Sequence, residues 1–234
     1  DNTACLIEDT RSKAIIEVIR RLAGYFGLKI YDERNGTGLL RHVLIRTGHK
    51  SGQILVILVM ASTFFPSKKN FIRELIRECP EITSVVININ NRRTSMILGD
   101  RQYTEYGSGY IEDTLCGITY RISPKSFYQV NAVQTELLYT KAIELARLTG
   151  SETVIDAYSG IGTIGMTVAG HVRKVISVET NTDAVKDARR NAKANNISNI
   201  DIYADDAGRF MRRMADNNET CDVIFMDPPR AGSD

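Results

Sequence analysis

The chain has 234 residues, a formal net charge of +2 at pH 7 and a hydrophobic fraction of 43%. This length accommodates one large domain or two small ones, and this apolar content is sufficient for a sizeable core. The small net charge lacks the broad basic excess of a stand-alone nucleic-acid-binding protein. No apolar run reaches the roughly 20 residues of a membrane-spanning helix, so we expect no membrane association.

The four cysteines, Cys5, Cys79, Cys116 and Cys221, form no C-x-x-C pair and show no metal-ligand spacing. They predict unpaired thiols in a reducing, cytoplasmic compartment and a protein without a bound metal. The chain begins with Asp1 rather than Met, and we therefore expect it to be a piece of a longer protein.

Residues 1–122 predict a small α+β domain with antiparallel strand pairing. The expected elements are a helix capped by Thr10, a hairpin of strands 42–46 and 53–60, a helix after Pro66, and strands over 82–89, 94–98 and 117–122. The polar, glycine-containing stretch 31–39 is expected to be a loop.

Residues 123–234 predict a second domain, of the α/β class. Asn131 is the expected N-cap of a helix whose apolar face holds Val133, Leu137, Leu138, Ala142, Ile143 and Ala146. From Thr153 onward, short apolar strands alternate with amphipathic helices, one of them over residues 182–194. This alternation predicts a parallel, Rossmann-like sheet with right-handed crossovers.

A glycine-rich turn follows the first of these strands. Residues 160–165 read G-x-G-x-x-G, and Glu179 lies at the end of the next apolar run. Glycines allow a tight turn and a close approach of backbone to ligand, and an acid at this spacing can accept hydrogen bonds from ribose hydroxyls. The pattern predicts a nucleoside-bearing cofactor. Asp156, just before the turn, is expected either to face a charged amino-acid group of the cofactor or to stabilise the turn.

A second motif, Asp227-Pro228-Pro229-Arg230, follows the apolar stretch 223–226. It brings a carboxylate and backbone carbonyls to the end of a strand, because neither proline offers an N–H group. Enzymes that use S-adenosylmethionine often carry such an element, whereas dehydrogenases do not require it.

With these motifs, the sequence resembles the RNA uracil-C5 methyltransferase family, and the ribosomal RNA branch more than the tRNA branch. The resemblance depends on the segments 127–131 (FYQVN), 156–162 (DAYSGIG) and 227–232 (DPPRAG), and on Glu179 with the helix after it. It implies a Rossmann-like methyltransferase domain, preceded by a central domain that faces RNA and contains the stretch 38–43 (GLLRHV).

The resemblance also implies a set of site residues and partners. The S-adenosylmethionine contacts would be Gln129, Tyr158, Gly160, Glu179 and Asp227, with Asp206 or Asp205 bonding the adenine amine. The partner would be RNA, most of all 23S ribosomal RNA. The cysteine nucleophile and the general base of the family would lie beyond Asp234, the RNA-binding β-barrel before Asp1, and the iron–sulfur cysteine cluster of some members is absent from this stretch. We therefore expect no catalytic residue within the chain, and little or no activity from the chain alone.

Three alternatives stay open. Another S-adenosylmethionine-dependent methyltransferase, acting on an amino group or on tRNA uracil, shares most of the motifs, although amino-group enzymes often carry an aromatic residue where Arg230 stands. A nicotinamide-dependent oxidoreductase also uses G-x-G-x-x-G. A non-catalytic RNA-binding piece is the third.

Overall fold

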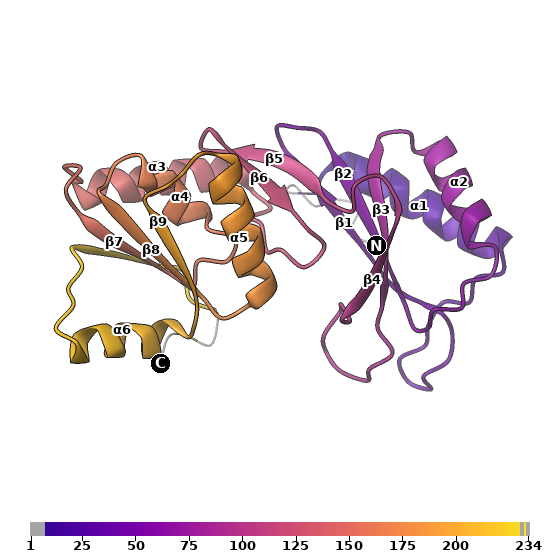
Figure 1. Cartoon of the computed structure of the whole chain (residues 1–234). Helices are drawn as coiled ribbons and strands as arrows, with labels where there is room; N and C mark the ends of the chain where they lie inside the picture. Colours follow the sequence, from indigo (N-terminus) through magenta and orange to yellow (C-terminus); the bar gives the residue numbers. More distant parts are fainter. Residues whose placement is uncertain (1–7, 230–231, 233–234) are drawn as a thin grey trace. The chain divides into compact units, whose positions relative to one another are not determined.

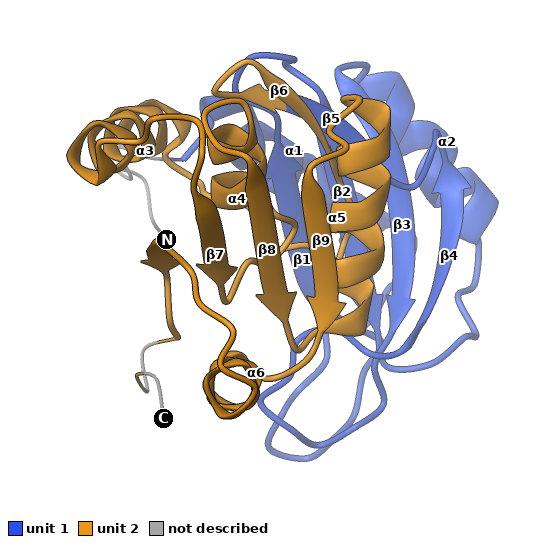
Figure 2. Cartoon of the chain, turned by 60° about the vertical axis from the view of Figure 1, so that its left-hand side comes forward, with its two compact units in different colours: residues 1–113 blue, residues 114–234 orange. Residues whose placement is uncertain are grey.

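The computed structural model describes residues 8–229 and 232, and the chain divides into two compact units, residues 1–113 and 114–234 (Figure 2). The division lies earlier in the chain than the domain boundary that the sequence suggested after residue 122. Among the described residues, no helix is long and apolar enough to cross a membrane.

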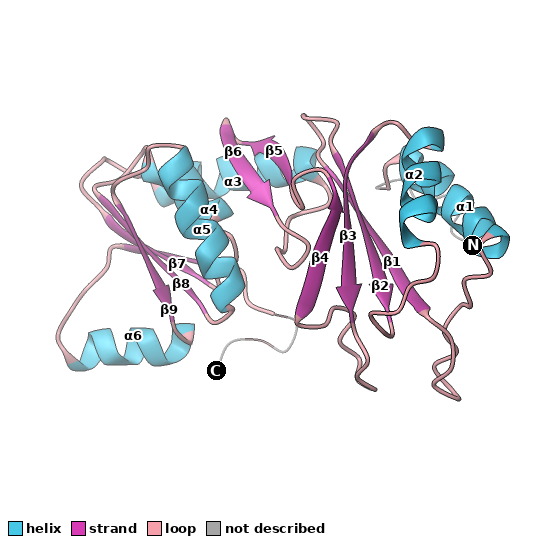
Figure 3. Ribbon diagram, turned by 45° about the vertical axis from the view of Figure 1, so that its right-hand side comes forward, coloured by secondary structure: helices cyan, strands magenta, loops and turns pink. Residues whose placement is uncertain are grey.

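The first unit is a four-stranded sheet in the order β1-β2-β3-β4, with helices α1 and α2 on one face (Figures 1 and 3). Its elements are α1 (Thr10–Tyr25), β1 (Leu40–Thr47), β2 (Ile54–Met60), α2 (Lys68–Glu78), β3 (Ile82–Ile89) and β4 (Arg101–Tyr106). Alternate residues of β2 and β3 pack against the helices, because successive side chains of a strand point to opposite faces. All seven residues of β2 are buried, as its continuous apolar run predicts.

Three expectations for this unit need correction. Strands β1 and β2 form the expected antiparallel hairpin, but β2 and β3 are parallel because α2 crosses over between them. Residues 94–98 form no strand: they belong to a loop, and the fourth strand is β4. The N-cap of α1 is Asp9 rather than Thr10, since the Asp9 carboxylate accepts the Arg11 N–H at 2.9 Å.

The second unit is built on a four-stranded parallel sheet in the order β10-β7-β8-β9. Its elements are β6 (Ile118–Ile122), α3 (Ala132–Ala146), β7 (Thr153–Ala157), α4 (Thr163–Ala169), β8 (Lys174–Glu179), α5 (Thr182–Ala194), β9 (Ile200–Ala204), α6 (Ala207–Asp216) and β10 (Val223–Met226). Strand β5 (Ile111–Leu115) spans the division and pairs with β6. Helices α4 and α5 lie on one face of the parallel sheet and α6 on the other (Figure 3). The Rossmann-like prediction is confirmed.

The packing of α3 differs from the predicted apolar face. Asn131 does cap this helix, accepting the Gln134 N–H at 3.2 Å, but the buried positions are Ala132, Thr135 and Tyr139. Leu137 and Leu138 are 60% and 65% exposed. The Tyr139 hydroxyl, 2.9 Å from Thr163 Oγ1, ties a different side of the helix to α4. Of the predicted face, Ile143 packs against the apolar cluster of β7 and α4, so hydrophobic periodicity identified the helix and only part of the side that packs.

Candidate cofactor site

The turn after β7 has a left-handed backbone at three of its residues. Tyr158, Gly160 and Gly162 have φ angles of 62°, 57° and 83°. A positive φ costs a side-chain-bearing residue about 1 kcal/mol or more, and glycine adopts it freely. A Cβ at Gly160 would meet no atom within 4 Å, so the space above this residue is open. The chain thus turns from β7 into α4 at the carboxyl edge of the sheet, with Gly160 partly exposed.

Asp156 stabilises this turn from below. The side chain is 1% exposed, and its Oδ2 atom accepts the Gly165 N–H at 2.8 Å and lies 3.4 Å from the Ser177 hydroxyl. Burial raises the pKa of the Asp156 carboxyl to about 7. Of the two roles predicted for Asp156, these contacts favour the structural one.

Glu179, at the end of β8, contacts the same turn from the neighbouring strand. Its Oε2 atom accepts the Gly160 N–H at 2.9 Å, and its Oε1 atom accepts the Asn181 N–H at 2.7 Å. A carboxylate offers about four lone-pair sites, so acceptor capacity remains for a ligand. The side chain is half-buried. An acceptor is therefore held in a fixed position beside the open backbone of Gly160.

Gln129 and Asp227 meet at the same carboxyl edge of the sheet. The Gln129 Nε2 atom lies 3.4 Å from Asp227 Oδ2, although 98 residues separate them in the chain. Asp227 follows β10 directly and is exposed. Because β10 and β7 are parallel neighbours, with Met226 opposite Ala157, Asp227 lies at the same level of the sheet as the glycine turn. In open parallel sheets, ligands bind outside the carboxyl ends of the strands.

Comparisons with known proteins agree with this architecture. A sequence profile described as tRNA (Uracil-5-)-methyltransferase matches residues 82–234, more than half of the chain. This chain belongs to the tRNA (uracil-5-)-methyltransferase family. A protein of Listeria innocua described as an uncharacterized RNA methyltransferase is 42% identical over 234 residues, which are 100% of this chain and 51% of that protein. One of Streptococcus mutans with the same description is 44% identical over 226 residues, 97% of this chain and 50% of that protein.

Among solved structures, the tRNA (uracil-54, C5)-methyltransferase of Pyrococcus abyssi, in complex with S-adenosyl-L-homocysteine, superposes with a TM-score of 0.75. It is 25% identical, and the alignment covers 97% of this chain and 53% of that one. The chain therefore spans about half the length of the relatives that it matches. Membership of this methyltransferase family argues against the nicotinamide-dependent alternative.

Three further residues of the predicted set, Tyr158, Asp206 and its alternative Asp205, have structural roles that limit how they can contact a ligand. Tyr158 is half-buried and packs against the apolar cluster beneath β7, β8 and α6. Asp206 is the N-cap of α6, and its Oδ1 atom accepts the Arg209 N–H at 2.8 Å. Asp205 forms an ion pair with Arg213, which lowers the pKa of the Asp205 carboxyl. One carboxylate oxygen of Asp206 therefore remains free to accept a hydrogen bond from a ligand. Asp205 has less acceptor capacity left, because it is engaged in an ion pair.

Cys79 and Cys221 do not have the environment of a nucleophile. Burial raises the pKa of the Cys79 thiol to about 11, and it also raises the pKa of Cys221. Cys221 packs against the apolar cluster below the sheet, before β10 begins and so away from Asp227. Cys5 lies outside the described residues, as does Arg230. Among residues 8–229, no group of histidines, cysteines and carboxylates could hold a metal ion.

Sequence reasoning missed the residues that fix the predicted ones in place. Asn181 caps α5, accepting the N–H groups of Asp183 and Ala184, while its own N–H binds Glu179. Asp187 and Asn191 are buried polar residues on α5. A signal was present in the sequence, because Asp183, Asp187, Asn191 and Asn195 recur every fourth residue along a helix.

Proposed function

We propose that this chain is the cofactor-binding part of an enzyme that methylates C5 of uracil in RNA with S-adenosylmethionine, and that the RNA is ribosomal. The observation that carries the proposal is the position of Glu179, which binds the backbone of Gly160 beside open space at the sheet edge. In a member of this family, that geometry suits a ribose.

The residues present fit this cofactor chemically. Glu179 and Asp227 bring two carboxylates to one edge, and both are among the charges that raise the pKa of buried Asp156 beneath them. A positively charged sulfonium and amino group are attracted by such a set, whereas a dinucleotide diphosphate is repelled by it. Glu179 would hold the ribose, and Gln129 with Asp227 would border the reacting end. When bound, S-adenosylmethionine supplies the methyl group that uracil receives.

The nucleophile of this reaction is proposed to lie outside these residues. Uracil C5 is a poor nucleophile until a thiolate adds to C6, and a general base must later remove the C5 proton. Burial raises the pKa of the Cys79 and Cys221 thiols. Cys221 also precedes β10, whereas Asp227 follows that strand. We therefore assign the cysteine and the base to the part of the longer relatives that this chain does not span.

Two measurements test this proposal. Calorimetric titration of the protein with S-adenosylhomocysteine and with NAD is expected to detect only the first ligand, more weakly for the 234-residue chain than for a protein of the relatives' length. In a radioactive methyl-transfer assay, a protein of the relatives' length is expected to methylate unmodified 23S ribosomal RNA transcripts. The 234-residue chain alone is expected not to methylate them. Binding of NAD alone, or methylation of uracil by the 234-residue chain, would contradict the proposal.

The family description and the Pyrococcus abyssi enzyme favour a second substrate, tRNA. The same transfer assay separates the two, with unmodified tRNA and ribosomal RNA transcripts compared at equal concentration. Preference for tRNA by a factor of ten or more in kcat/KM, about 1.4 kcal/mol, would replace the ribosomal assignment.

We also propose that the first unit contacts RNA through the loops 31–39 and 90–100. A buried arginine, Arg41, holds both loops: its side chain is 1% exposed, binds Glu33 at 2.7 Å and donates to the carbonyls of Asn90 and Arg92 at 2.9 and 2.8 Å. Buried Asn90 in turn donates to the carbonyls of residues 96 and 97. The loops are thereby ordered before any partner binds.

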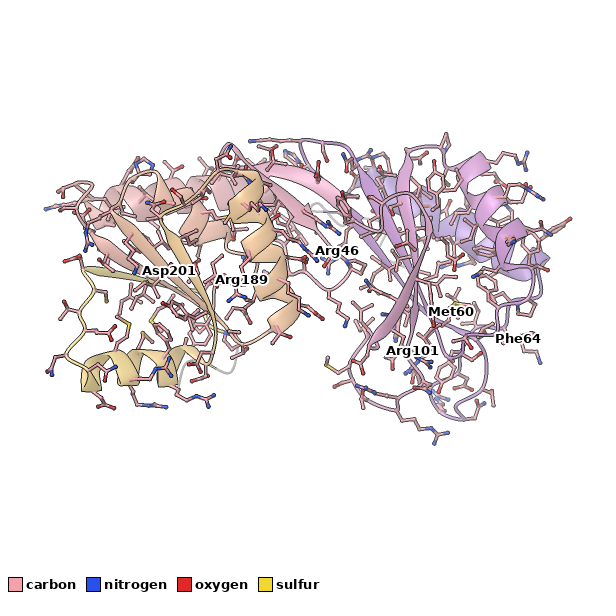
Figure 4. All side chains as sticks on the ribbon, viewed as in Figure 1. Arg46, Met60, Phe64, Arg101, Arg189 and Asp201 are labelled. Carbon is pink, nitrogen blue, oxygen red and sulfur yellow. The ribbon has the colours of Figure 1, made fainter. Side chains whose placement is uncertain are left out.

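What these loops expose suits a nucleic acid. Arg34 and Arg93 are exposed, and Met96 and Ile97 are 65% and 46% exposed. Exposed cations bind phosphates, and apolar side chains can pack on bases. Figure 4 shows Arg101 and Phe64 at the same end of the sheet as Met60. In the double variant Arg34→Ala with Arg93→Ala, the plot of log affinity for RNA against log salt concentration is expected to become less steep. The change should correspond to the loss of about two phosphate contacts. Arg73→Ala, an exposed arginine of α2, is the control, and an equal loss there would contradict this surface.

A further inference from the structure

Helix α5 substitutes for a neighbouring strand along one edge of β6. Asn195 accepts the Thr119 N–H at 3.1 Å and donates to the Thr119 carbonyl at 2.7 Å. One helical turn earlier, Asn191 accepts the Arg121 N–H at 2.9 Å and donates to the Arg121 carbonyl at 3.4 Å. Thr119 and Arg121 are alternate residues of the strand, so their backbone groups point to the same edge. Two side-chain amides thus reproduce the pairing of a strand, while the other edge of β6 pairs with β5.

The same row of side chains continues beyond the end of β6. The Asp187 Oδ2 atom accepts both the Ser123 and the Ser126 hydroxyls at 2.7 Å. Ser126 also bonds to the Ser123 backbone N–H at 2.9 Å, which closes a short turn. Asp187 and Ser126 are 4% and 1% exposed. A buried carboxylate with two short hydrogen bonds from hydroxyls fixes its partners closely, since charge-assisted bonds are strong and directional.

This turn leads directly to the Gln129 side of the site. Ser126 precedes Gln129 by three residues, and Asn131 then caps α3. Tyr128 is 8% exposed, with its ring 6.3 Å from that of Tyr120 on β6. The segment is therefore anchored on both sides of Gln129. Among the described residues, the Gln129 side-chain amide makes one hydrogen bond, to Asp227 at 3.4 Å.

The N-terminus of α5 is attached to the other half of the site. Its N-cap, Asn181, donates its N–H to Glu179 Oε1 at 2.7 Å. Helix α5 thus contacts Glu179 at its N-terminus and binds segment 119–126 along its length. A helix is stiff over such a distance, so the spacing between Glu179 and Gln129 is fixed by α5 rather than by the loops themselves.

We propose that Asp187 and Asn191 are positioning residues: they fix segment 119–131 against α5 and thereby hold the Gln129 amide beside Asp227. In its reference to a cofactor, this inference depends on the function proposed above. The pairing itself does not, and it can be tested without any ligand.

The first test is spectroscopic. The side-chain amide signals of Gln129 in the ¹⁵N-labelled protein are identified by their loss in Gln129→Ala. Asp227→Asn is expected to move these signals in the otherwise unchanged protein, because the two groups are in contact. In the Asp187→Ala and Asn191→Ala backgrounds, this displacement is expected to disappear. Val185→Ala removes buried volume from the same helix and leaves the hydrogen bonds of Asp187 and Asn191 to this segment in place, so the displacement is expected to persist there. Persistence of the displacement in both α5 backgrounds would overturn the proposal.

The second test is a double-mutant cycle on cofactor affinity. Asp187→Ala is expected to weaken S-adenosylhomocysteine binding about tenfold. Asp187→Asn is expected to weaken it less, because the asparagine keeps one oxygen that can accept the serine hydroxyls. In a Gln129→Ala background, Asp187→Ala is expected to cause little further weakening, since both changes remove the same interaction. A full tenfold loss in that background would show a purely structural role and overturn the proposal. If the ligand does not bind at all while the spectroscopic coupling is present, the positioning role stands and the proposed function fails.

Discussion

The side chains of Gln129 and Asp227 lie 3.4 Å apart, the first after a turn held by α5 and the second at the end of β10. Among the described residues, the Asp227 side chain has no hydrogen-bond partner other than Gln129.

Replacing the Asp227 carboxylate with an amide keeps the shape of the side chain and removes its charge. We therefore expect Asp227→Asn to lower methyl transfer by the longer protein about 100-fold, the size of effect typical of a misplaced or weakened reacting group. Radioactive methyl transfer at saturating RNA measures it. Asp216→Asn, at the exposed end of α6, is the control, and an unchanged rate in Asp227→Asn would exclude a role at the reacting end.

Glu179 is expected to contribute mainly to cofactor affinity. Glu179→Gln keeps the size of the side chain and removes the charge that strengthens hydrogen bonds from ribose hydroxyls. We expect S-adenosylhomocysteine binding to weaken about tenfold, or about 1.4 kcal/mol, as measured by calorimetric titration. Glu144→Gln, an exposed residue of α3, should bind as the unchanged protein does. Equal affinities for the Glu179 variant and this control would remove Glu179 from the site.

Asp156 makes stability depend on pH. Its pKa is raised to about 7 from an ordinary value of 3.8, chiefly by burial. Between these values the folded protein keeps a proton that the unfolded chain has released, so the free energy of unfolding falls as pH rises through this window. The limit is about 1.4 kcal/mol per pH unit. We expect Asp156→Asn to remove this slope, as measured by urea denaturation at several pH values from about 4.5 to about 7. Identical slopes in both proteins would contradict the buried, protonated state.

Gly165 is expected to tolerate no side chain. A Cβ atom there would lie 2.7 Å from both Asp156 Oδ2 and Ser177 Oγ. Those atoms are buried and hydrogen-bonded, so they cannot move aside freely. We expect Gly165→Ala to reduce the free energy of unfolding by about 1–3 kcal/mol. Gly170→Ala is a matched control, because a Cβ at Gly170 meets nothing within 4 Å. Chemical denaturation compares the two, and similar stabilities would show that the turn adapts.

The sequence by itself determined the parallel sheet and pointed to the residues of the candidate site. Strand and helix periods fix which residues face the core, and a glycine turn followed by Glu179 at the next strand end reflects local backbone requirements that any fold must satisfy. These features depend on neighbours in the chain, and the structure confirms the alternation of strands and helices from Thr153 to Met226. Local rules also gave the cap of α3 at Asn131.

Only the tertiary structure decided which polar groups meet. The stretch 94–98 reads as a strand because Ile97 and Leu98 are apolar. In the structure, buried Asn90 donates to the carbonyls of residues 96 and 97, and buried Asn88 binds the backbone of Gly99 just after them, in place of a neighbouring strand. Leu137 and Leu138 of α3 are exposed, which shows that an apolar pattern can identify a helix face without showing what packs against it. The contacts of Asn191 with Arg121 and of Gln129 with Asp227 join residues far apart in sequence. Such contacts arise from the crossing of whole elements in space, which no local period encodes.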